Sequence, residues 1–191
     1  MNPKEARLSK LRDICLMCRE CDLCKTRTKL VFGDGFADAR VMFIGEAPGR
    51  DEDLQGVPFV GRSGQLLRKM IQVIGLKQED FYIANILKDR PPNNRTPSQD
   101  EIGKCIRFLH KQIEIIQPKL LVLLGKTAVN GILPEHKKMS MAELRLRSEG
   151  LAFQGVPVRV TYHPSALLRN PNWKPLAAED FKALHLYCQK L

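Results

Sequence analysis

Residues 40–49 read RVMFIGEAPG, a short apolar run that ends abruptly in glycine, proline and an acid. The run is rich in residues that favour strands and too short for a helix, so we expect a buried strand followed by a turn. Three similar runs occur at residues 81–87 (FYIANIL), 119–125 (KLLVLLG) and 157–162 (PVRVTY). Their near-continuous apolar character is typical of strands that are covered on both faces.

Helical patterns separate these runs. Residues 63–74 carry apolar side chains at helical spacing, and Ser98 with Glu101 forms a capping box that begins a helix over residues 99–116. Alternating strands and helices predict the α/β class, here a three-layer αβα sandwich around a central, mainly parallel sheet of four strands. We find no repeat or long linker and therefore expect a single domain over residues 1–191, with a cysteine-rich helical segment at about residues 1–30.

A polar motif follows each predicted strand. The motifs are GEAPG, KDRPPNNRTP, GKTA and HPSALLRN, in chain order. In open α/β sheets the ligand crevice lies at the carboxyl ends of the strands, so we expect these motifs to meet at one site. Residues 45–61 are not a phosphate-binding loop, because the GxxxxGK[ST] order is absent and their acids would repel phosphate.

The chain is basic. Lys and Arg outnumber Asp and Glu by 31 to 21, which gives a formal net charge of +10 over 191 residues. This surplus suits a polyanionic partner, although a solvated basic surface without a partner is the alternative. The sequence has no apolar run long enough to span a bilayer, and MNPKEARLSK lacks the features of a signal peptide. We therefore expect a cytoplasmic protein with no membrane partner.

The motifs together resemble one known family. GEAPGRDEDLQGVPFVG, Asn85, the NNRTP turn and HPSALLRNP are similar to the family 4 uracil-DNA glycosylases, the iron–sulfur branch of their superfamily, from about Cys18 to Leu168. The resemblance implies a DNA repair enzyme that flips uracil out of DNA and hydrolyses its N-glycosidic bond, leaving an abasic site for base excision repair. It implies single- or double-stranded DNA as substrate, uracil as product and a monomeric enzyme.

The resemblance also assigns residues to a uracil pocket. It implies that Phe59 stacks on the base, that Asn85 reads the pyrimidine edge and that His163 donates to uracil O2 as negative charge grows there. Gly45 and Ala47 complete this predicted pocket. Ala47 and Gly49 stand where the best-known uracil glycosylases have an aspartate and a thymine-excluding tyrosine, so thymine must be rejected by other walls.

Water activation and DNA entry complete the implied roles. Glu46 and Asn94 both match positions implicated near the attacking water, and we place Glu46 first because a carboxylate accepts a proton whereas an amide only orients water. His163 joins them as the third catalytic residue. The resemblance implies a minor-groove loop that fills the gap left by the flipped base; its residues are Ser165, Ala166, Leu167 and Leu168. Arg169 beside them is a candidate phosphate contact.

Four cysteines crowd into residues 15–24, CLMCRECDLC, which in a reducing compartment favours metal over disulfides. The family holds a 4Fe-4S cluster on four cysteines, and alignment with its motifs implies ligands at Cys18, Cys21 and Cys105. Asp89 occupies the remaining family position. Three alternatives are open. Asp89 ligates one iron through oxygen, Cys15 or Cys24 supplies the missing sulfur, or the cluster has three irons, is labile or is absent.

We favour Asp89 as the fourth ligand, because Arg90, Pro91 and Pro92 keep the family pattern around it. Zinc on the four N-terminal cysteines, Cys15 to Cys24, is the competing metal hypothesis. The cluster is expected to tie the N-terminal segment to the core. Cys188 is expected to pack rather than to ligate.

A second function class remains open, a metal-bearing DNA-binding or uracil-trapping member of the superfamily without turnover. The trapping branch forms its adduct through a histidine in an extra basic loop. The segment between Asp89 and Ser98 is short and has no histidine, which favours an enzyme that turns over.

Overall fold

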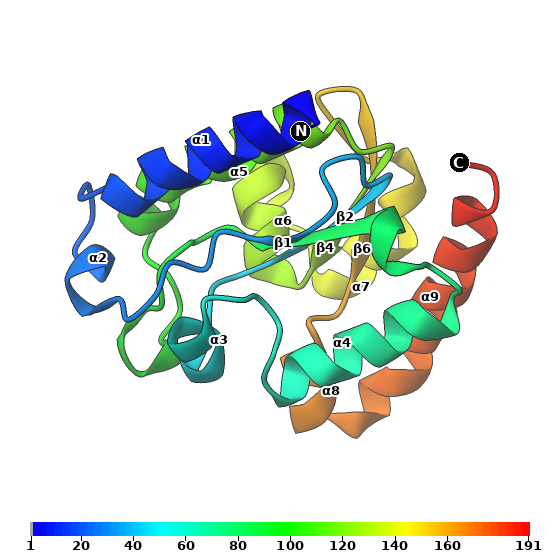
Figure 1. Ribbon diagram of the computed structural model, residues 1–191. Coiled ribbons are helices and arrows are strands. Elements are labelled where there is room, and N and C mark those ends of the chain that lie inside the picture. The colour runs from blue at the N-terminus through cyan, green and yellow to red at the C-terminus, as the bar shows by residue number, and fades with distance from the viewer. Residues whose placement is uncertain (1) are drawn as a thin grey trace.

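The computed structural model describes residues 2–191 and contains a sheet with the strand order β1-β3-β2-β4-β6-β5 (Figure 1). The strands are β1 (Asp34–Gly35), β2 (Val41–Gly45), β3 (Phe81–Asn85), β4 (Leu120–Leu124), β5 (Ala152–Phe153) and β6 (Val156–Thr161). β3, β2, β4 and β6 run parallel, and the two short edge strands pair antiparallel. The mainly parallel sheet is confirmed, but the predicted count of four strands was wrong because the sheet has six.

The helices alternate with these strands. They are α1 (Pro3–Met17), α2 (Leu23–Thr26), α3 (Arg50–Gln55), α4 (Arg62–Val73), α5 (Gln99–Ile116), α6 (Lys126–Ile132), α7 (Met141–Leu146), α8 (Pro164–Arg169) and α9 (Lys174–Cys188). Short 3-10 turns occur at Gln78–Asp80, Pro92–Asn94, Pro134–His136, Ser148–Gly150 and Pro171–Trp173. The predicted capping box is present, since the Ser98 side chain accepts from the Glu101 N–H at 3.2 Å and Glu101 accepts from the Ser98 N–H at 2.8 Å.

Helices cover both faces of the sheet. Met42 and Ile44 of β2 pack on the side of α1, α5 and α6, whereas Val41 and Phe43 pack on the side of α4 and α9. Figure 1 shows α1 lying along α5 above the sheet, with α4 and α9 below it. Each fully buried aliphatic or aromatic side chain stabilises such a core by roughly 1.5–3 kcal/mol, so the alternation along every inner strand fixes its register.

The N-terminal helix α1 carries part of the cysteine cluster to the body of the protein. It begins at Pro3 because Asn2 caps it, accepting from the Lys4 N–H at 3.0 Å. Leu8 and Cys15 face inward, and the helix ends at Met17 with Cys18 as its C-cap. Within residues 2–191, no helix has the length and apolar character needed to cross a membrane.

Candidate functional site

A cavity of about 670 Å³ opens where β2, β3, β4 and β6 end. This volume is within the usual range for small-molecule sites, about 300–1,000 Å³. All four predicted motifs reach it, as expected for the carboxyl edge of a parallel sheet. The predicted site residues that line it are Glu46, Ala47, Phe59, Asn85, Asn94, His163, Ser165 and Ala166. Gly45, Leu167 and Leu168 are not among its lining residues.

Asn85 ends β3 and presents an unpaired amide to the cavity. The side chain is 2% exposed, and its Oδ1 has no hydrogen-bond partner among residues 2–191. Buried polar atoms are normally paired, so this amide is available to a ligand that brings its own donor. Gly45 is the strand neighbour of Asn85, and a Cβ there would lie 2.4 Å from Asn85 Oδ1 and 2.6 Å from Phe59 Cζ. Gly45 therefore shapes the pocket by having no side chain.

Phe59 is held in a left-handed backbone conformation, with φ 55°. Such a conformation costs a non-glycine residue of order 1–3 kcal/mol and persists only where neighbours enforce it. Glu52 supplies part of this restraint, because one of its carboxylate oxygens accepts from the N–H groups of Val60 at 3.0 Å and Gly61 at 2.9 Å. Arg68 Nε donates to the Phe59 carbonyl at 3.3 Å, and Gly64 permits the close approach of the chain, since a Cβ there would meet the Phe59 carbonyl carbon at 2.0 Å. The structure thus fixes the aromatic wall.

His163 caps α8 and faces Phe59, with the ring centroids 5.6 Å apart. The Ser165 N–H donates to His163 Nδ1 at 3.1 Å, and a backbone N–H can only donate. The neutral ring therefore carries its proton on Nε2. Burial, with a smaller contribution from the charge of Arg169, lowers the pKa of His163 to about 4. At neutral pH the ring is consequently an uncharged N–H donor.

Glu46 and Asn94 enter the cavity with partners of their own. The Thr127 hydroxyl donates to Glu46 Oε2, which leaves the other carboxylate oxygen free to face the cavity. Asn94 accepts from Arg90 Nε at 2.6 Å through its side-chain oxygen. Sequence reasoning missed Thr127, although its position in the GKTA motif at the end of β4 was the available signal.

The segment predicted as a minor-groove loop is a short helix, α8 (Pro164–Arg169), because Pro164 opens it and His163 caps it. Leu167 is 1% exposed and packs with Tyr162 and Ala177. It is a core residue in this conformation, and the entry of all four residues into DNA stays a prediction. Leu168 is 38% exposed and is the large apolar side chain that α8 presents to solvent.

A second, much smaller hollow lies between the end of α1, α2, the turn after β3 and α5. Its lining includes five cysteines and Asp89; we call it the cysteine hollow, and the cysteines are Cys15, Cys18, Cys21, Cys24 and Cys105. Its volume is about 20 Å³. Among residues 2–191, no three His, Cys, Asp or Glu side chains converge as a ready site for a single metal ion. The donor set nevertheless fits an iron–sulfur cluster, which takes four thiolates and spans more space than one ion.

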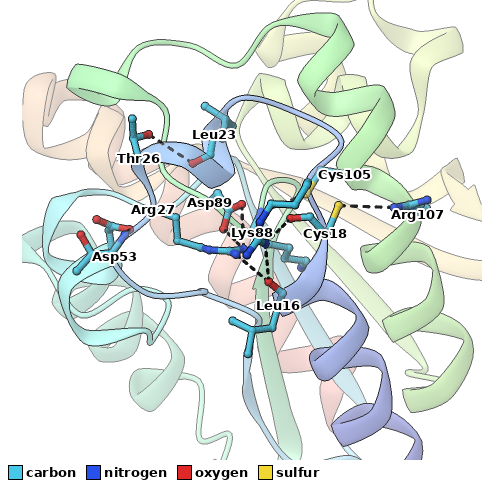
Figure 2. A network of polar contacts seen from close by, with 12 residues as sticks. Leu16, Cys18, Leu23, Thr26, Arg27, Asp53, Lys88, Asp89, Cys105 and Arg107 are labelled. Carbon is cyan, nitrogen blue, oxygen red and sulfur yellow. Dashed lines mark hydrogen bonds and ion pairs between the residues drawn. The ribbon is translucent and has the colours of Figure 1, made fainter.

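Asp89 is engaged by Arg27 (Figure 2). Arg27 Nη1 donates to both carboxylate oxygens, at 3.2 and 3.3 Å, and Arg27 Nη2 donates to the Leu16 carbonyl at 2.8 Å. The Arg27 and Asp89 side chains are only 8% and 13% exposed. Burial raises the pKa of Asp89, and the Arg27 charge opposes this rise. The pair ties the turn after β3 to the C-terminal end of α1.

Lys88 is a fully buried cation beside the same hollow. Its ammonium donates to the Asn85 carbonyl at 2.8 Å and to Gln112 Oε1 at 2.7 Å, and no carboxylate within residues 2–191 forms an ion pair with it. Burial lowers the pKa of Lys88 to about 8, while thiolate charge on Cys105 or Cys15 would raise it. The Lys88 N–H also donates to Cys105 Sγ at 3.3 Å. Sequence reasoning missed Lys88 because lysine is rarely buried.

The fold and the cavity define an α/β protein with an aromatic-walled pocket at the carboxyl edge of its sheet. Residues 32–184 match the family model described as the Uracil DNA glycosylase superfamily. A type-4 uracil-DNA glycosylase of Thermotoga maritima is 46% identical over 175 residues, 91% of this chain and 90% of the relative. That of Archaeoglobus fulgidus is 43% identical over 179 residues, 92% of this chain and 90% of the relative.

That of Sulfurisphaera tokodaii is 40% identical over 182 residues, 93% of this chain and 83% of the relative. The chain therefore belongs to the uracil-DNA glycosylase superfamily and, within it, to the type-4 uracil-DNA glycosylases. This membership confirms the resemblance read from the four motifs.

Proposed function

We propose that this protein is a DNA repair glycosylase that removes uracil from DNA by hydrolysis, leaving an abasic site. The observation that carries the proposal is the meeting of three groups in one cavity. They are the unpaired carboxamide of Asn85, the fixed face of Phe59 and the neutral imidazole of His163. Together they offer a flipped pyrimidine a stacking surface, an edge-reading amide and a donor.

Base selection follows from Asn85. A carboxamide has one acceptor and two donors, so it pairs with the N3–H and O4 of uracil, whereas cytosine presents the reversed pattern. Because Asn85 is buried beside Gly45, the amide has little freedom to rearrange for the wrong base. Leaving a buried polar group unpaired costs roughly 1–3 kcal/mol, which disfavours cytosine.

Bond cleavage then needs a group that stabilises the departing anion. As the N-glycosidic bond lengthens, its electron pair moves onto uracil N1 and O2, and we assign the Nε2–H of His163 to O2. A donor aimed at developing charge contributes about 10²–10³ in rate. Glu46 accepts a proton from the attacking water, whose oxygen bonds to the sugar carbon, and Asn94 orients that water. Ser165 and Thr127 hold His163 and Glu46 in place.

We assign insertion into the DNA minor groove to α8, and contact with phosphate to Arg169 at its C-terminal end. Leu168 is the exposed apolar side chain positioned to enter the minor groove. Arg169 lines the cavity and forms no ion pair within residues 2–191, so it is free to contact phosphate.

The proposal includes a 4Fe-4S cluster in the cysteine hollow, held by Cys18, Cys21 and Cys105 with a fourth ligand from Asp89, Cys15 or Cys24. When bound, the cluster supplies a covalent tie between the N-terminal segment and α5. We also retain the expectations of a single domain and a monomer in the cytoplasm. Sedimentation of the purified chain tests the monomer.

The decisive experiment uses a uracil-containing oligonucleotide treated with the protein and then with alkali. Strand cleavage at the uracil supports the glycosylase. A gel-stable adduct would instead indicate a uracil trap, and retardation without cleavage would indicate a DNA-binding protein. An oligonucleotide with thymine at the same position is the control and is expected to stay intact.

A further inference from the structure

We propose that Cys15 supplies the fourth thiolate of the iron–sulfur cluster, with Cys18, Cys21 and Cys105, and that Asp89 is a structural anchor rather than a ligand. This inference rests on the proposed function, of which the cluster is a part. On ligation the Cys15 thiol loses its proton to solvent and its sulfur forms one bond to iron, without a change of oxidation state at the sulfur.

Asp89 already has a partner. Both of its carboxylate oxygens contact Arg27, and the pair is nearly buried. Figure 2 shows Arg27 lying between Asp89 and the Leu16 carbonyl at the end of α1. Turning Asp89 towards iron would weaken its buried ion pair with Arg27 and leave the positive charge of Arg27 buried without a full counter-charge. Arg27 and Asp89 thus hold together the same two segments that a cysteine at position 89 would link through a cluster.

Cys15 lies beside the three cysteines that the family resemblance assigns to the cluster. It lies in the last turn of α1, is 2% exposed, and lines the cysteine hollow together with Cys18, Cys21 and Cys105. The Cys18 N–H donates to the Cys15 carbonyl at 3.1 Å, so the chain turns between the two residues. Cys15, Cys18 and Cys21 form a C-x₂-C-x₂-C run, a spacing that ferredoxins use to bind clusters, and since Cys18, Cys21 and Cys24 have the same spacing, it is burial that separates Cys15 from Cys24.

Lys88 carries a buried charge beside these cysteines. Within residues 2–191 its ammonium donates only to neutral oxygens, yet a buried cation needs an anion nearby. Cys105 Sγ accepts from the Lys88 N–H at 3.3 Å, and Cys15 and Cys105 pack in one core cluster that does not include Cys24. Ligation of both Cys15 and Cys105 would place thiolate charge beside Lys88. Cys24 lies on α2 and, unlike the buried Cys15, is partly exposed.

The test measures iron and sulfide per chain, with electron paramagnetic resonance, after anaerobic reconstitution of the full chain. Cys15→Ala is compared with Cys188→Ala, a matched control because Cys188 is also buried at 3% exposure but lies in α9. We expect about four irons in the wild type and in Cys188→Ala, and about three or fewer in Cys15→Ala. Four irons in Cys15→Ala would overturn the proposal.

A second pair of variants tests which residue is the fourth ligand without altering Cys15. Asp89→Asn keeps an acceptor for Arg27 but removes the carboxylate, and Cys24→Ala removes the other candidate. We expect both to retain about four irons. Loss of iron in Asp89→Asn would assign the fourth ligand to Asp89, and loss in Cys24→Ala would assign it to Cys24. Either loss overturns the proposal even if Cys15→Ala does not fold.

The double variant Cys15→Ala/Asp89→Cys provides a rescue, because it returns a thiol to the other side of the hollow. We expect its iron content to rise back towards four. None of these readouts depends on uracil excision. A chain that binds its cluster through Cys15 but leaves uracil in DNA would refute the proposed function alone, whereas a glycosylase that keeps four irons in Cys15→Ala would refute only this inference.

Discussion

Replacing Gly45 with alanine tests the pocket with a single methyl group. The added Cβ would lie 2.4 Å from Asn85 Oδ1 and 2.6 Å from Phe59 Cζ, so both side chains must retreat by about 1 Å to reach the 3.4 Å of ordinary contact. Neither can do so easily. The backbones of Gly45 and Asn85 are register partners, the Ile86 N–H donates to the Gly45 carbonyl at 3.0 Å, and Phe59 has a restrained backbone.

The expected effect follows from this geometry. Overpacking a rigid site costs about 1–3 kcal/mol of stability. A misplacement of about 1 Å in a positioning group lowers rate by about 10²-fold. We therefore expect Gly45→Ala to reduce the single-turnover rate of uracil excision by about 10²-fold and to lower the free energy of unfolding in urea by about 1–3 kcal/mol.

Gly103→Ala is the matched control. Gly103 lies within α5, and a Cβ there would meet nothing within 4 Å. Because alanine favours a helix over glycine, this variant should gain about 0.5–1 kcal/mol of stability and keep full activity. The reasoning would be refuted if Gly45→Ala cleaved uracil-containing DNA at the wild-type rate, since Asn85 and Phe59 would then tolerate displacement or play no part.

Other predictions concern single side chains. His163 has a pKa lowered to about 4 from 6.5, so between these pH values the unfolded chain binds a proton that the folded chain does not. The free energy of unfolding of the wild type should therefore fall by up to about 3 kcal/mol relative to that of His163→Gln as the pH drops through this window, and level off below it. Urea titrations at several pH values measure this difference. An equal pH dependence in the two proteins would contradict the lowered pKa of His163. Asn85→Ala should lower kcat/KM by at least about 10-fold while affinity for uracil-free DNA stays unchanged, which gel retardation measures. Glu46→Gln should lower kcat by about 10²–10⁴-fold with little change in KM, and an unchanged kcat would assign water activation elsewhere. Arg169→Ala should reduce the slope of log affinity against log salt by about one, a result that a solvated arginine would not give.

The inner sheet and its two main helices could be predicted because they follow simple periodicities. The apolar runs at residues 40–45 and 81–87 became β2 and β3, and the capping box at Ser98 marked the first turn of α5. The edge strands β1 and β5 could not be predicted, because two residues carry no alternation and their pairing depends on neighbours brought close by the fold.

The convergence of the four motifs was predictable from strand direction alone. The partners that hold the site were not. Thr127 lies 81 residues from Glu46, Lys88 lies 24 residues from Gln112, and no local pattern links Arg27 to Asp89 across 62 residues. The segment of α8 was expected to be a loop because of the family resemblance, although Pro164 is well suited to the first turn of a helix.

The left-handed backbone of Phe59 affects which substitutions are favoured at this position during evolution. Glycine and asparagine adopt that conformation more readily than phenylalanine does, so either would relieve local strain. A library of variants screened for heat resistance alone should therefore lose the aromatic ring at position 59, whereas a library screened for survival under cytosine deamination should keep it. The residue found at position 59 would then indicate whether a lineage was selected for heat resistance or for repair of deaminated cytosine.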